Sequence, residues 1–392
     1  MANKTRWLKN GLVIGVLLLA IAAVVLVALA WVAMGTGPDE ARAARMHSSP
    51  NSADGVFTNP QPLWNDFWGS ISASLEMSEF AVPNEPIPVV ENTEMLLGVP
   101  YDGARLTWLG HSTVLIEIAG KKILTDPVFG ESTSPIPALG PQRWYPPPVS
   151  LDSLDDVDIV LISHDHYDHL DYPTIVKMAE WDCLFLVPLG VGAHLEYWGV
   201  PADKITELDW WDEYESGLLR IAATPARHAS GRHLLDQNRT LWAGYAIIGP
   251  KNRIMFSGDT GLFDDMKAIG EKYGPFDIVM IEVGAYHRAW PDWHIGPEQA
   301  IKAHKWMNGE VFMPIHWGLF NLAMHGWTEP VERAMVAAKA GGVRITVPKP
   351  GHPFQVDAAP VPIKWWPKVP WQTASDHPIV STRDGNPDNR YD

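Results

Sequence analysis

The stretch SHDHYDHLD, residues 163–171, packs three histidines and three aspartates into nine positions directly behind the apolar run Ile159–Ile162. Solvated turns use Asp, Asn and Gly, but they seldom need three histidines. Residues two apart in an extended turn point to the same side, so His164 and His166 can approach one ion together. Asp168 and His169 lie one step further and can face a second ion. Zinc-type ions accept both donors, so the turn predicts two halves of a metal site.

Matching groups recur just past the ends of other apolar runs. His228 stands in TPARHASGR, Asp259 in SGDTG and His316 in MPIHWG. Groups at the carboxyl ends of neighbouring strands converge on one edge of a sheet. We therefore expect one metal held by His164, His166 and His228, a second held by Asp168, His169 and His316, and Asp259 as a bridge between them.

Composition narrows the kind of protein. The chain has 392 residues and a formal net charge of −16, which argues against a nucleic-acid partner because neutralising phosphates needs a basic face. The single cysteine, Cys183, excludes an intrachain disulfide and a cysteine-rich zinc module. Any metal must then be held by histidine and carboxylate.

The first residues suggest a membrane segment. Residues 11–34 carry no charge and follow the basic residues Lys4, Arg6 and Lys9. Such a run is long enough to cross a hydrocarbon core of ~30 Å. Residues 1–36 are therefore expected to form a single-pass anchor, with the rest of the chain extracytoplasmic, either periplasmic or extracellular. A cleaved signal peptide and a buried soluble helix are the alternatives.

The rest of the chain divides by its pattern. Residues 37–60 are small and polar and indicate a linker, residues 61–355 the globular domain, and residues 356–392 an irregular tail. A strand meander over residues 105–125 is followed by strands that alternate with helices. This order predicts an α/β protein in which two sheets are sandwiched between helices. The Pro-rich stretch 129–150 is either a lid or a static surface loop.

The motifs as a set resemble a known superfamily. TDP at Asp126, SHDHYDHLD, ARH, SGDTG and PIHWG are similar to those of the metallo-β-lactamase-fold hydrolases. The longer stretches WLGHSTVLIEIAGKKILTDPVF, GPQRWYPPP and PIHWGLF resemble the group of N-acylphosphatidylethanolamine-hydrolysing phospholipases D. The resemblance implies a four-layer αββα sandwich with two Zn²⁺ per chain. It also implies phospholipase D-type hydrolysis of N-acylphosphatidylethanolamine-like phospholipids by a metal-bridging hydroxide.

The resemblance also implies roles for residues near the metals. Asp126 would accept a hydrogen bond from a ligand imidazole and fix its orientation. From its place in the turn, Asp165 is expected either behind the ligands or next to a general base. Asp259 would be catalytic as the residue shared by both ions. His294 is a candidate for protonating the leaving group, although it can equally be a residue that starts the helix at Pro297.

Substrate contacts are less clearly marked. Arg143 and Arg288 are candidates for anchoring a phosphate, with surface solvation as the alternative. His111, in WLGHST, is either a substrate-binding residue at the edge of the site or a packing residue in a turn. Asp168 stands where the β-lactamase branch carries Cys, which weakens a lactamase interpretation. His287 and Asp292 depart from the group's pattern and leave the headgroup-contacting surface open.

The expected partners follow from the charge of the site. Two dications, two aspartates and a hydroxide leave a local charge of about +1, which attracts a phosphodiester. A phospholipid at a membrane, or another anionic phosphodiester, is the expected substrate. A soluble anionic substrate such as a sugar-phosphate lactone is one alternative, and a non-catalytic metal-binding sensor is another. Iron or manganese could also occupy sites of this kind.

Overall fold

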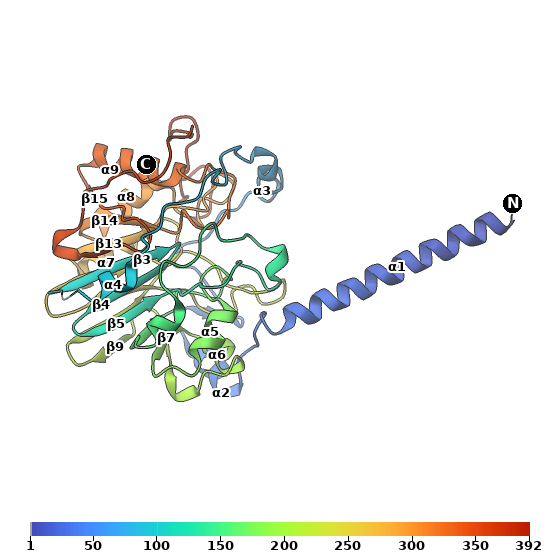
Figure 1. The fold of residues 1–392 in the computed structure, drawn as a ribbon, viewed down its shortest axis with the longest axis horizontal. Coiled ribbons are helices and arrows are strands. Elements are labelled where there is room, and N and C mark those ends of the chain that lie inside the picture. Colours follow the sequence, from blue (N-terminus) through green and yellow to red (C-terminus); the bar gives the residue numbers. More distant parts are fainter. Residues whose placement is uncertain (1, 100) are drawn as a thin grey trace.

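The computed structural model describes residues 2–99 and 101–392, without the side chains of residues 2–9, 11, 29 and 74. Two seven-stranded sheets form its centre (Figure 1). The first has the order β16-β3-β4-β5-β6-β7-β8, with β3 Ala104–Gly110, β4 Thr113–Ile118, β5 Lys121–Thr125, β6 Ile159–Leu161, β7 Leu184–Pro188, β8 Ile205–Leu208 and β16 Pro353–Gln355. The second has the order β15-β14-β13-β12-β11-β10-β9, with β9 Glu213–Ser216, β10 Leu219–Thr224, β11 Gly244–Ile248, β12 Arg253–Phe256, β13 Phe276–Glu282, β14 Gly309–Ile315 and β15 Arg344–Ile345.

Both sheets are mixed in the same way. In the first, β16, β3, β4 and β5 pair antiparallel, and β5 to β8 pair parallel. In the second, β9 to β12 pair antiparallel, and β12 to β15 pair parallel. The carboxyl ends of the parallel strands in each sheet therefore share one edge, where ligands of open α/β sheets gather.

Helices cover the outer faces of both sheets. Their bounds are α5 Tyr172–Met178, α6 Gly192–Tyr197, α7 Met266–Tyr273, α8 Pro297–Trp306 and α9 Glu329–Gly341. Ile175 of α5 and Leu195 of α6 pack with Val160 in one apolar cluster outside the first sheet. The larger cluster lies between the sheets and continues under α7 to α9. The predicted α/β architecture, with two sheets sandwiched between helices, is confirmed.

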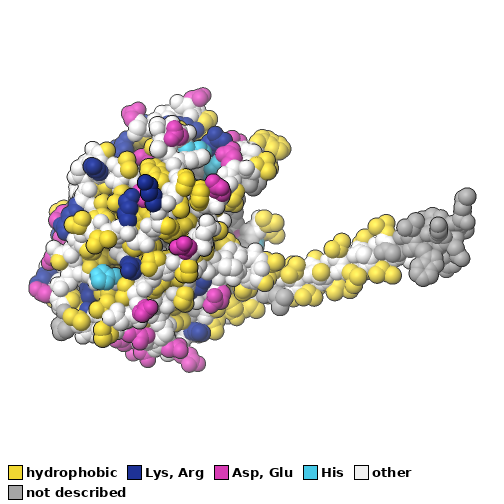
Figure 2. Space-filling model, turned by 45° about the horizontal axis from the view of Figure 1, so that its top comes forward, with side chains coloured by type: hydrophobic (Ala, Val, Ile, Leu, Met, Phe, Trp, Pro, Cys, Tyr) yellow, Lys and Arg dark blue, Asp and Glu magenta, His cyan; other side chains and the backbone are white. Residues whose placement is uncertain are grey.

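The N-terminal helix α1, Ala2–Trp31, projects from the body (Figure 1), and Figure 2 shows apolar side chains along its described part. A membrane span requires both length and continuous apolar character. Within residues 2–99 and 101–392, no helix meets both conditions. The prediction of a single-pass anchor, and of an extracytoplasmic catalytic domain inferred from it, was therefore wrong. The side chains of Lys4, Arg6 and Lys9, which oriented that prediction, lie outside the described part.

Residues 37–60, expected to be a linker, contain the helix α2, Glu40–Ser48, and a hairpin of β1, Ser52–Ala53, with β2, Val56–Phe57. Two short helices follow, α3 Phe67–Ala73 and α4 Thr93–Leu97. The guanidinium of Arg42 lies 2.7 Å from the carboxylate of Glu196 and 2.8 Å from that of Glu207. These ion pairs fix α2 to the body of the domain.

The C-terminal tail is irregular along most of its length but is not loosely attached. Thr382 is fully buried, and its N–H donates to Asp292 Oδ1 over 2.6 Å. The buried guanidinium of Arg227 binds the same carboxylate at 2.9 Å and donates to the Thr382 carbonyl over 2.7 Å. It also donates to the carbonyl of Pro62. The tail and the segment before α3 thus meet beneath the loop that carries His228.

Candidate metal centre

Residues at the strand ends build the centre. The turn 163–171 follows β6, Asp126 follows β5, His228 lies beyond β10, Asp259 beyond β12 and His316 directly after β14. Asp126 and His316 adopt positive φ values of 33° and 62°. Such angles are uncommon outside glycine and cluster at functional sites, because the surrounding structure must hold them in place.

Three imidazole nitrogens converge in the first half of the centre. His166 Nδ1 lies 2.9 Å from His164 Nε2 and 3.2 Å from His228 Nε2. Two ligand atoms of a tetrahedral ion bound at about 2.0–2.1 Å lie roughly 3.3 Å apart. The Nδ1–H of His228 donates to the carbonyl of Trp293 over 2.8 Å, which leaves its Nε2 lone pair facing the centre. That is the tautomer of a metal ligand.

The second half combines two imidazoles with a carboxylate. Asp168 Oδ2 lies 3.2 Å from His316 Nε2 and 3.3 Å from His169 Nε2. Within the described residues, His169 Nε2 is buried without a hydrogen-bond partner of good geometry. These spacings match those of the first half and again suit a shared cation.

Asp259 lies between the two halves. Its Oδ2 is 3.1 Å from both His169 Nε2 and His316 Nε2, and 3.9 Å and 3.8 Å from the Nε2 atoms of His164 and His228. Its Oδ1 is buried and unpartnered among the described residues. A buried carboxylate oxygen left without a partner is costly unless an ion completes the site.

The protonation of these groups fits a metal site. Burial lowers the pKa of His164 and His228 well below the usual range, so both are neutral, as ligands must be. Burial alone would lower the pKa of His316 too, but Asp259 and Asp168 outweigh it and raise that pKa to about 10. In the metal-free protein, His316 is therefore protonated. Its positive charge offsets the two aspartates, as a bound cation would. The donor set of histidine and aspartate therefore fits a pair of divalent cations.

Residues behind the centre orient it. Asp126 accepts a hydrogen bond from His169 Nδ1 over 2.6 Å, and from the N–H and the hydroxyl of Ser163, each over 2.6 Å. Asp165 points elsewhere: its carboxylate accepts from Gly231 N–H over 2.7 Å and from the Thr240 hydroxyl over 2.8 Å. Asp165 thus holds the loop after His228 in place, and its carboxylate does not face the centre.

Glu282, at the end of β13, was not identified from the sequence. Its Oε2 lies 2.8 Å from His294 Nδ1, and its other oxygen accepts the N–H of Thr260. The only available signal was a carboxylate that closes the apolar run DIVMIE. His294 is the more exposed partner, with 17% of its side chain accessible, and lies 3.8 Å from Asp259 Oδ2. Burial lowers its pKa to about 4.

The three predicted substrate contacts occupy different places. His111 lies inside the centre, 1% exposed, with Nε2 2.9 Å from Asp168 Oδ2 and its ring 4.0 Å from that of His316. Arg143 donates to the carbonyls of Phe129 and Tyr145 and so ties the Pro-rich loop together. Arg288 is exposed and pairs with Glu76 at 2.6 Å. The structure brings His111 to the metal centre but engages both arginines in other contacts.

Comparisons with known proteins show what the chain is similar to. A family described as "Beta-lactamase superfamily domain" matches residues 121–317. The chain is 45% identical over 332 residues to an uncharacterized protein of Mycobacterium tuberculosis, covering 81% of this chain and 87% of that protein. It is 36% identical over 290 residues to the N-acyl-phosphatidylethanolamine-hydrolyzing phospholipase D 1 of Caenorhabditis elegans, covering 68% and 81%. The structure of Igni18, a metallo hydrolase of Ignicoccus hospitalis, superimposes with a TM-score of 0.50 at 25% identity, covering 64% of this chain and 98% of that one.

Proposed function

The chain belongs to the β-lactamase superfamily of metal-dependent hydrolases, and from this we propose that it cleaves a phosphodiester bond of a phospholipid with two zinc ions. The observation that carries the proposal is the position of Asp259, whose Oδ2 lies within 3.9 Å of imidazoles from both halves of the centre. A carboxylate so placed would serve two cations, and such a pair would stabilise both the attacking and the leaving oxygen of a phosphodiester. The phospholipase D-type cleavage of an N-acylated ethanolamine phospholipid rests on the relative from Caenorhabditis elegans.

We propose that His164, His166 and His228 hold one ion, Asp168, His169 and His316 the other, and Asp259 both. When bound, the ions would lower the pKa of water to about 7 and stabilise charge on the phosphate oxygens.

The chain's own residues would set the geometry of the reaction. Asp126 keeps the proton of His169 on Nδ1, so that Nε2 faces the centre. Glu282 holds Nδ1 of His294 at 2.8 Å, which leaves the other ring nitrogen free to exchange a proton with the leaving alcohol. His111 supports Asp168 from the side of β3.

The experiment combines metal analysis with a substrate panel. Purified full-length protein should contain close to two zinc per chain, and with vesicles of N-acylphosphatidylethanolamine it should release phosphatidic acid and N-acylethanolamine. Asp259→Ala should abolish release, whereas Asp102→Ala, which removes an exposed carboxylate paired with Lys251, should not. Release of diacylglycerol instead would refute the site of cleavage. Turnover of only a soluble phosphodiester would refute the phospholipid.

A further inference from the structure

A buried arginine lies against the back of the ligand-bearing turn. Arg232 is 3% exposed, and its Nη1 donates to the carbonyls of Asp165 over 2.6 Å and Leu170 over 2.9 Å. These two carbonyls bracket residues 166–169 of the turn. The guanidinium also lies over the ring of Tyr167, 4.1 Å from its centroid. Arg232 therefore holds both ends of the segment that carries three of the proposed ligands.

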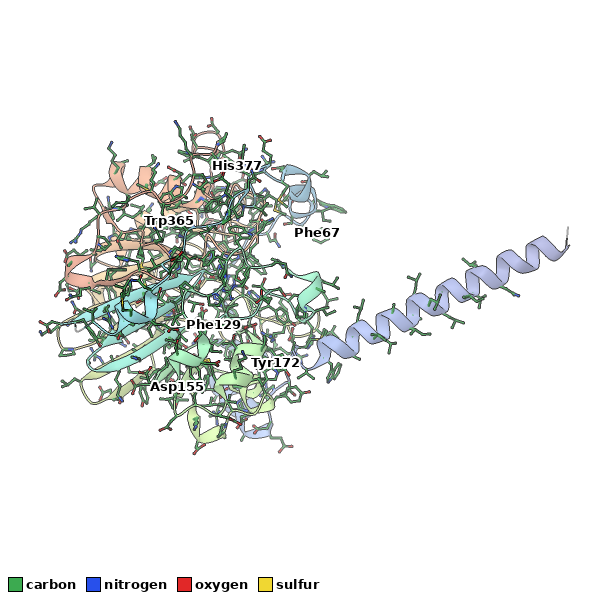
Figure 3. All side chains as sticks on the ribbon, viewed as in Figure 1. Phe67, Phe129, Asp155, Tyr172, Trp365 and His377 are labelled. Carbon is green, nitrogen blue, oxygen red and sulfur yellow. The ribbon has the colours of Figure 1, made fainter. Side chains whose placement is uncertain are left out.

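The opposite side of the same guanidinium binds the chain just after α1. Nε and Nη2 of Arg232 both donate to the carbonyl of Ala33, over 3.0 Å and 2.7 Å. Trp198, whose ring lies 5.0 Å from the guanidinium, donates its indole N–H to the carbonyl of Val32 over 2.7 Å. Tyr172, labelled in Figure 3, packs on Trp198 with ring centroids 5.4 Å apart. The segment 32–36 is thus bound to the domain at this point.

A second connection runs beside the first. The N–H of Thr36 donates to His194 Nδ1 over 3.1 Å, and His194 Nε2 lies 3.4 Å from Asp165 Oδ2. Gly35 has φ +77°, and a Cβ at this position would lie 2.1 Å from His194 Nδ1. Only glycine allows the segment to approach this closely.

The environment of Arg232 is unusual for a buried cation. In the part of the chain that the structure describes, its guanidinium hydrogen bonds all go to main-chain carbonyls. Buried charges are normally paired with an opposite charge, because desolvation costs several kcal/mol. The planar guanidinium of Arg232 instead donates four hydrogen bonds to three carbonyls, for which no other donor is seen among the described residues. This arrangement fixes the relative position of two chain segments.

We propose that Arg232 is a positioning residue that couples the docking of segment 32–36 to the geometry of the metal-binding turn. The proposal rests on the proposed metal centre for its effect on zinc, but the coupling itself concerns the protein alone. A change that undocks the segment loosens the turn and weakens zinc binding. By reciprocity, zinc binding strengthens the docking of the segment.

Two variants of the full chain test the coupling from its two ends. Arg232→Met removes the donors while keeping an unbranched apolar stem. Gly35→Ala prevents docking at a distance from the ligands. Gly217→Ala is the matched control, since Gly217 also has a positive φ of 60° but has no heavy atom within 4 Å of an added Cβ. An effect that comes only from placing alanine at a positive φ should therefore also be seen in Gly217→Ala.

The first readout needs no metal. The amides of His169 and Leu170 both donate to the carbonyl of His166, over 3.0 Å and 2.8 Å, so hydrogen exchange at these amides reports the order of the turn. In metal-free protein, Arg232→Met and Gly35→Ala should each accelerate this exchange about tenfold, whereas Gly217→Ala should not.

The second readout is zinc affinity by competition with a chelator. Both variants should bind zinc roughly 10–100-fold more weakly than Gly217→Ala, the range expected when support behind ligands is lost. If either variant matches Gly217→Ala in the exchange measurement, the coupling is refuted. A wild-type protein that binds no zinc would instead refute the proposed function, and the exchange measurement would still decide the coupling.

Discussion

Replacing Asp126 by Asn tests the hydrogen bond that orients His169. The carboxylate accepts from Ser163 N–H through one oxygen and from His169 Nδ1 through the other, each over 2.6 Å. An amide has a single acceptor oxygen, so one of these two donors must face an NH₂ group. If the oxygen stays with Ser163, His169 must move its proton to Nε2, where it blocks metal binding.

The expected size of the effect follows from these contacts. Asp126→Asn loses one charge-assisted hydrogen bond in a fully buried position, which is worth about 1.5–3 kcal/mol. At 1.4 kcal/mol per factor of ten, zinc affinity at the second half of the centre should fall roughly 10–150-fold. In this variant the first half of the centre should bind zinc more tightly than the second half does. His228 of the first half is oriented by the carbonyl of Trp293 and not by Asp126.

Chelator competition with a zinc-responsive dye resolves the two binding steps. Asp158→Asn is the control, because it also neutralises a carboxylate that accepts a main-chain N–H, here from Lys122. Only Asp126→Asn should lower the zinc affinity of the weaker binding step, and Asp158→Asn should leave both steps as in the wild type. Two unshifted steps, or an equal shift of both, would show that Asp126 does not orient His169.

Three further results are expected. His294→Gln should lower kcat while zinc content stays unchanged, and equal loss of zinc would show that His294 is a ligand instead. Burial lowers the pKa of His294 to about 4 and that of His111 to about 3, so between these values and about 6.5 the two histidines bind more protons in the unfolded chain than in the folded one. The metal-free protein should therefore gain stability as the pH rises from about 4 to 6.5. Urea midpoints that stay constant or fall over this range would contradict this expectation. Asp292→Asn leaves the buried guanidinium of Arg227 without its charge partner and should lower the free energy of unfolding by about 3–5 kcal/mol, whereas a loss below about 1 kcal/mol would show that the carbonyls of Pro62 and Thr382 suffice.

The residues that the structure gathers at the strand ends were easier to find in the sequence than the elements at the periphery, for a physical reason. Strands buried on both faces, such as Ile159–Leu161, are continuous apolar runs, and the proposed ligands stand just beyond their ends. The strands β8 and β9 escaped notice because they lie at the sheet edges and are half-exposed, so their sequences, ITEL and EYES, lack an apolar run. Glu282 escaped notice because a single carboxylate at a strand end resembles an ordinary boundary.

The N-terminal region shows the limit of reading composition alone. An uncharged run predicted a membrane anchor, which the described helices do not support. The polar stretch at residues 37–60 indicated a linker, yet Arg42 and Met46 attach it to the domain. Contacts between segments about 150 residues apart, such as that of Arg42 with Glu196, cannot be predicted from the residues that neighbour either one in the sequence.

The contacts of Arg227 determine where the chain can be trimmed. Two of its acceptors, Pro62 and Thr382, lie on either side of the family match at residues 121–317. Cutting the gene at those limits would remove both, so the buried guanidinium, one residue from His228, would keep Asp292 and the carbonyl of Leu262 but lose its contacts with the flanking segments. A fragment that keeps both contacts therefore includes Pro62 and Thr382, and one that also keeps the contacts of Arg232 begins before Ala33, so expression boundaries and fusion tags are best placed outside that longer span.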